Sequence, residues 1–153
     1  MVDRYTPENF HPRASVGALI GRVRGALFST MDEALAQFDL TTPQYVALVM
    51  IANGTATRPG DISKKIQHDP GAMTRLIDKL EQHGLVRRVS DPNDRRALNL
   101  ELTAHGKALY PKVIKVTMDV MNRSLSGFTQ AEAQQLEDML QRMIANVEQR
   151  DTQ

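Results

Sequence analysis

Apolar residues recur three or four positions apart along most of the chain, which is the spacing of one face of an amphipathic helix. This pattern predicts helices over 13–38, 41–53, 59–67, 70–83 and, as two long segments, 104–147. Side chains able to cap a helix N-terminus stand at the expected starts: Thr41, Asp69, Thr103 and Thr129. The chain is therefore expected to be mainly α-helical.

Two short segments between these helices follow a period of two residues instead. Leu98, Leu100 and Leu102 alternate with smaller or polar residues over 97–102, as in a half-exposed strand. The segment 85–90 precedes this strand across a stretch rich in turn-forming residues. The two segments are predicted to pair as a β-hairpin.

The order of elements over 40–102 is helix, helix, short turn, helix and hairpin, which is the order of a winged helix-turn-helix. The predicted fold class is mainly α with a small β-hairpin wing, that is, a winged helix-turn-helix plus a helical dimerisation region. In such a fold the helix over 70–83 lies in the major groove of DNA.

The helix over 70–83 divides into an apolar and a polar face. Met73, Leu76, Ile77 and Leu80 are expected to pack inward. The residues expected to face DNA from this helix are Pro70, Gly71, Ala72, Thr74, Arg75 and Lys79. Of the residues at the start of this helix, Arg75 is the one able to form a bidentate contact with guanine. The hairpin tip adds Asn93, Arg95 and Arg96, whose chemistry suits phosphates or a narrow minor groove.

The charge of the chain is nearly balanced but unevenly distributed. The formal net charge is +1. Residues 58–96 carry nine basic and six acidic side chains, whereas the remainder carries a slight acidic excess. This local basic excess favours an anionic partner such as double-stranded DNA, although ordinary solvated helix faces would also account for it.

Motifs of other chemistries are absent from the sequence. The four histidines show no metal-binding spacing, and no nucleophile elbow, phosphate-binding loop or dinucleotide motif occurs. No catalytic residue, metal or cofactor is expected, so the protein is predicted not to be an enzyme. A winged helix that binds another protein rather than DNA remains the alternative, although such a module has no need of Arg95 and Arg96.

No association with a membrane is expected, because the longest unbroken apolar run is eight residues and a span needs about twenty. A signal peptide is not expected either, and there is no cysteine, which fits a cytoplasmic protein.

Several motifs occur in register across the predicted winged domain. They are Leu40-Thr41-Thr42-Pro43-Gln44-Tyr45, Thr74-Arg75-Leu76-Ile77-Asp78-Lys79-Leu80-Glu81, Gly84-Leu85-Val86-Arg87-Arg88, Asp91-Pro92-Asn93-Asp94-Arg95-Arg96, Leu102-Thr103 and Gly106. In this combination the sequence resembles the MarR family of winged helix-turn-helix transcriptional regulators. It departs from many members at Pro70, Gly71 and Ala72, where they have serine or threonine, so that base recognition rests more on Thr74 and Arg75.

The resemblance implies a homodimer and a site for an effector. The DNA-binding domain would be 40–102, and 10–39 with 103–150 would form one intertwined dimerisation region. The apolar stripes of those terminal segments independently favour a partner, because they are too long to leave exposed. The resemblance further implies a repressor that binds an inverted-repeat operator and is released by a small aromatic or phenolic ligand.

The resemblance also implies roles for a few individual residues. Asp94 is implied to support the wing by pairing with Arg96. The ligand is implied to bind between the two regions, where Arg13, Arg22 and Tyr45 are the candidate contacts. Packed or solvated roles for these three side chains are the simpler interpretation. The absence of cysteine argues against the oxidation-sensing members of the family.

Overall fold

The computed structural model describes residues 3–66, 69–91 and 98–149. The chain divides into two compact units, residues 1–120 and 121–153, and each is considered by itself. The expected class is confirmed: the chain is mostly helical, with one two-stranded antiparallel hairpin among the described residues. No helix in the described ranges is both long and apolar enough to span a membrane.

The first unit begins with a 3₁₀ turn, η1 (Pro12–Ala14), and the helix α1 (Val16–Leu35). Ser15 separates them in an extended conformation, and its side chain accepts a hydrogen bond from the Ala18 N–H at 3.3 Å. A second 3₁₀ turn, η2 (Ala36–Phe38), then leads to Asp39, whose φ is +55°. The single helix expected over 13–38 is therefore three consecutive segments: extended Ser15 separates η1 from α1, and α1 passes directly into the 3₁₀ turn η2, which ends at Asp39.

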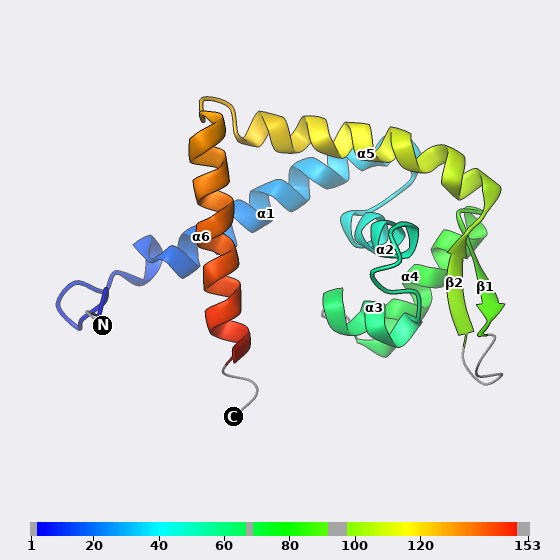
Figure 1. Cartoon of the computed structure of the whole chain (residues 1–153), viewed down its shortest axis with the longest axis horizontal. Coiled ribbons are helices and arrows are strands. Elements are labelled where there is room, and N and C mark those ends of the chain that lie inside the picture. The colour runs from blue at the N-terminus through cyan, green and yellow to red at the C-terminus, as the bar shows by residue number, and fades with distance from the viewer. Residues whose placement is uncertain (1–2, 67–68, 92–97, 150–153) are drawn as a thin grey trace. The chain divides into compact units, whose positions relative to one another are not determined.

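Three helices form the body of the winged domain (Figure 1). They are α2 (Thr42–Ala52), α3 (Pro59–Ile66) and α4 (Pro70–Gln82). The predicted inward face of α4 is confirmed, since Met73, Leu76, Ile77 and Leu80 are all buried. They share one apolar core with residues of the other two helices, including Leu48, Ile51 and Ile62. The core places α4 with one face fully packed and the opposite face in solvent.

The hairpin consists of β1 (Val86–Ser90) and β2 (Leu98–Leu102). Val86 pairs with Leu102, Arg88 with Leu100 and Ser90 with Leu98. The Leu100 N–H also donates to the Thr57 carbonyl at 2.8 Å, which joins the segment before α3 to the sheet. The alternation expected in β2 holds only in part: Leu100 is buried, Leu102 is half-buried, and Leu98 is 47% exposed. Leu98 lies at the end of the strand beyond the packed core.

Two long helices complete the chain. The helix α5 (Ala104–Ser124) begins after Thr103, whose hydroxyl accepts from the Gly106 N–H at 3.0 Å and also donates to the Gly84 carbonyl. The helix α6 (Gln130–Glu148) begins with the predicted capping box of Thr129 and Glu132. It has no buried residue. The caps expected at Thr129 and Asp69 are thus confirmed by their hydrogen bonds.

Candidate nucleic-acid interface

The six residues of α4 that are expected to face DNA lie on its accessible surface. Pro70, Gly71, Thr74, Arg75 and Lys79 are exposed or half-buried, as is Ala72, and none of the six is buried. The helix starts there because Asp69 caps it, its carboxylate accepting from the Ala72 N–H at 2.9 Å, and because Pro70 occupies the first helical position. All six helix residues expected to face DNA therefore lie opposite or beside the buried face.

Arg75 lies over the beginning of its own helix. A Cβ atom built on Gly71 would be 3.7 Å from an Arg75 guanidinium nitrogen and 3.2 Å from an Asp69 carboxylate oxygen. The pKa of Asp69 is lowered, first by the hydrogen bond from Ala72 and further by backbone donors and the charge of Arg75. Arg75 thus points its donors toward the N-terminal turn of α4, the part of a recognition helix that meets base edges.

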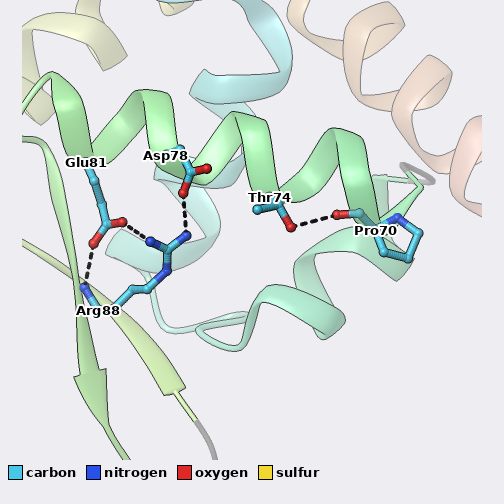
Figure 2. Close-up of polar contacts among 5 residues, drawn as sticks. All are labelled: Pro70, Thr74, Asp78, Glu81 and Arg88. Carbon is cyan, nitrogen blue, oxygen red and sulfur yellow. Dashed lines mark hydrogen bonds and ion pairs between the residues drawn. The ribbon is translucent and has the colours of Figure 1, made fainter.

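The Thr74 hydroxyl group donates a hydrogen bond within its own helix. Its hydroxyl donates to the Pro70 carbonyl, one turn earlier, at 3.0 Å (Figure 2). With the proton engaged, the oxygen offers only acceptor capacity outward, together with the side-chain methyl group. A base amino group or a thymine methyl group would complement this arrangement.

The far end of the same helix is fastened to the hairpin by Arg88. Its guanidinium binds Asp78 at 2.8 Å and also binds Glu81, and its backbone N–H donates to Glu81 at 3.1 Å. Figure 2 shows the two carboxylates reaching from α4 to this one side chain on β1. The pKa of Arg88 is raised, chiefly by the hydrogen bond to Asp78 and also by the charge of Glu81.

A second polar cluster lies at the outer end of the hairpin, just beyond the pair formed by Ser90 and Leu98. The Asp91 carboxylate, only 8% exposed, binds Arg58 at 2.6 Å and accepts from the Asn99 amide at 3.2 Å. Arg58 immediately precedes α3, so this cluster joins the start of α3 to the wing. The predicted tip residues Asn93, Arg95 and Arg96, and the predicted support Asp94, lie outside the described residues.

The three candidate ligand contacts are placed on three different elements. Arg13 is exposed in η1, Arg22 is exposed on α1, and Tyr45 on α2 is partly buried against the core. Other residues line two cavities beside α2, in the described part of the first unit. The larger, about 470 Å³, has Ile51, Thr57, Leu100, Lys107 and Tyr110 among its walls. The smaller, about 260 Å³, lies between α1, α2 and the end of α3 and includes Arg24, Phe28 and Lys65.

The sequence interpretation missed the polar ties of the wing. From the sequence alone, Asp78, Glu81, Arg88 and Asp91 are charged residues at motif positions, with no sign that they contact one another. The one signal available is that Asp78 and Glu81 are three residues apart on a helix and so share a face. No cluster of three or more potential metal ligands occurs among the residues that the structure describes.

Comparisons with known proteins agree with this architecture. The profile of the MarR family matches residues 40–98. The multiple antibiotic resistance protein MarR of Escherichia coli is 28% identical over 140 residues, covering 91% of this chain and 97% of that protein. YybA of Bacillus subtilis, named an uncharacterized HTH-type transcriptional regulator, is 30% identical over 84% of this chain and 86% of its own length.

Solved structures lead to the same family. A mutant of Escherichia coli MarR complexed with operator DNA superposes with a TM-score of 0.74 at 29% identity, covering 84% of this chain and 92% of that one. The regulator SlyA gives a TM-score of 0.78 at 28% identity, covering 88% of this chain and 94% of that one. YybA and SlyA are named as transcriptional regulators, which agrees with the expectation that the protein is not an enzyme. The protein belongs to the MarR family of winged helix-turn-helix transcriptional regulators.

Proposed function

We propose that the protein is a cytoplasmic, homodimeric repressor that binds an inverted-repeat operator through α4 and the wing. The observation that carries this proposal is the division of α4: one face is fully buried, and the other exposes Thr74 and Arg75 near the helix start. The operator complex of Escherichia coli MarR and the name of IacR, an HTH-type transcriptional repressor of Pseudomonas putida, support the same role.

Unpartnered apolar faces support the dimer. On α6, Leu136, Met139, Leu140, Met143, Ile144 and Val147 are between 37% and 65% exposed. On α1, Val16, Leu19, Ile20 and Val23 are between 38% and 58% exposed. Two such stripes are a liability in water unless a second copy covers them. In the proposed dimer, 10–39 and 103–150 of both chains make one intertwined region that holds the two domains over 40–102 apart.

A small aromatic acid or phenol is proposed to release the operator. The cavity of about 470 Å³ supports this, because Lys107 supplies a cation and Tyr110 supplies an aromatic wall with a hydroxyl group. It lies where α2, β2 and the start of α5 meet, so a bound ligand would touch both the wing and the helix that leads away from it. Arg13, Arg22 and Tyr45 remain candidate contacts in the assembled dimer.

Selection of bound duplexes from a random DNA library tests the central claim. A two-fold dimer should enrich an inverted repeat whose half-sites are about one helical turn apart. Binding to the selected duplex should weaken steeply with salt, because phosphate contacts release counterions. Enriched sequences without dyad symmetry would contradict the proposal, and enrichment of no sequence would favour a protein-binding module.

Substitutions should distinguish residues that read a base from residues that bind DNA regardless of its sequence. Arg75→Ala should cost about 1–3 kcal/mol of binding free energy and relax the preference at one base position per half-site. Arg96→Ala should weaken all sequences more evenly and affect A·T-rich flanks most. Asp94→Ala should weaken binding if Asp94 supports Arg96, whereas simple removal of a negative charge would tighten it.

A further inference from the structure

Arg88 and Arg87 are neighbours on β1 whose contacts differ in kind. Arg87 binds Glu101 across the hairpin at 3.0 Å, and both side chains are more than half exposed. The side chain of Arg88, which is 32% exposed, extends from β1 to α4 and binds two carboxylates there, those of Asp78 and Glu81. One arginine therefore holds the hairpin together, and the other holds the hairpin to the helix.

The two carboxylates that bind Arg88 lie on the same face of α4 as Thr74. Asp78 follows Thr74 by four residues and Glu81 by seven, so the three side chains lie along one side of the helix (Figure 2). The exposed end that carries Thr74 and the end tied to the wing thus belong to one row of side chains.

Apolar packing alone leaves the outer part of the hairpin unsupported. Leu100, opposite Arg88, is fully buried, but the next outward pair on that face is Ser90 with Leu98, both exposed. Arg88 is therefore placed where the packed base of the wing gives way to its exposed end. Three polar contacts at that point resist a change in the angle between hairpin and helix.

We propose that Arg88 is a positioning residue for DNA binding, which ties the wing to α4 so that both dock on the duplex as one rigid body. The inference rests on the proposed function. It assigns Arg88 no contact with DNA. Without this tie, the Arg58–Asp91 pair still joins the hairpin to the segment before α3, but the side-chain ion pairs between the hairpin and α4 are lost. We then expect α4 still to fit the major groove, and the wing no longer to reach the neighbouring minor groove in a fixed register.

The test uses the full-length protein and the duplex that the wild-type protein selects from a random library. Arg88→Met is compared with Arg87→Met, which removes the same charge one residue earlier and leaves the contacts to α4 intact. Dimethyl sulfate reports protection of guanine N7 in the major groove, and hydroxyl radicals report protection in the flanking minor groove. Both are measured at saturating protein and below the melting temperature of each variant.

The expected result is a split between the two grooves. Arg88→Met should lose the flanking minor-groove protection, keep the major-groove protection and bind about tenfold more weakly. Arg87→Met should keep both protections and bind within about threefold of wild type, because its ion pair is exposed. Equal minor-groove protection in the two variants, or its absence in the wild-type complex, would overturn the assignment.

An isosteric variant keeps the test decisive if Arg88→Met does not fold. Asp78→Asn with Glu81→Gln retains Arg88 and removes two negative charges from a helix that approaches DNA. If the carboxylates matter only as charge, this variant binds more tightly with its footprint unchanged, and the proposal is wrong. If they hold Arg88, the minor-groove protection weakens. Failure of the wild-type protein to select any duplex would instead refute the proposed function.

Discussion

The winged domain and the terminal helices bury their apolar residues to very different extents. On α4, all four residues of the apolar face are buried within the same chain. On α6, six apolar residues at the same helical spacing are at least 37% exposed, and no residue is buried. Both helices are amphipathic and capped, so sequence pattern and capping do not distinguish them. The difference shows that the first stripe has its partner within the chain, and we expect the second to find it in another copy.

The start of α5 limits this contrast, because it packs within the chain although it belongs to the terminal helices, and it gives the largest expected effect. A Cβ at Gly106, in α5, would lie 2.1 Å from the Leu85 carbonyl oxygen, and backbone cannot move aside cheaply. Gly106→Ala should lower the free energy of unfolding by about 3 kcal/mol or more, measured by urea denaturation. Gly60→Ala in α3 is the control, since no described atom beyond the neighbouring backbone of its own helix lies within 4 Å of its Cβ position. Equal stability of the two variants would show that α5 does not pack closely against Leu85.

The second-largest effect is expected from charged substitutions on the exposed apolar stripe of α6. Met139→Glu with Met143→Glu would place two carboxylates in the proposed dimer contact, and the dissociation constant should rise about 100-fold. Sedimentation equilibrium measures it. The matched control is Gln141→Glu with Ala145→Glu, which adds the same charge to the opposite side of α6. An equally stable dimer in both variants would show that the stripe is not buried by association.

The glycine ridge of α1 offers a smaller effect. Gly17, Gly21 and Gly25 are spaced every four residues, and among the described residues no atom beyond the neighbouring backbone of α1 lies within 4 Å of their Cβ positions. If a partner backbone packs there, Gly21→Ala should weaken dimerisation about tenfold, measured by sedimentation, despite its better helix propensity. An unchanged dimer with a more stable helix would mean that the ridge stays open in the assembly.

The smallest effect concerns the carboxylates that accept hydrogen bonds at the N-termini of α4 and α6. The pKa of Asp69 is lowered mainly by the Ala72 N–H, and that of Glu132 mainly by the Thr129 N–H. Each carboxylate therefore stabilises its helix above its unfolded-state pKa, and this contribution is lost as the pH falls through the lowered folded-state value. Carbon-13 NMR titration should find both values depressed, and Asp69→Asn and Glu132→Gln should each abolish the corresponding local pH dependence.

The sequence predicted those features that depend on neighbours along the chain. The buried face of α4, the Asp69 cap, and the Thr129 and Glu132 box all follow from spacings of three or four residues. The ties of Arg88 to α4 could not be predicted, because they exist only once the hairpin folds back beside that helix. The exposure of Leu98 was missed for a related reason: alternation marks a face, but not how far the core extends beneath it.

The cap of α2 has a consequence for protein engineering. Both the backbone N–H and the hydroxyl of Thr42 donate to one Asp32 carboxylate oxygen, each at 2.6 Å, and Asp32 belongs to α1. The helix that opens the DNA-reading module therefore has its first turn completed by a residue ten positions upstream. A chimera that joins this domain to a foreign oligomerisation domain should therefore begin before Asp32. The transferred segment then keeps the carboxylate that accepts the hydrogen bonds of Thr42.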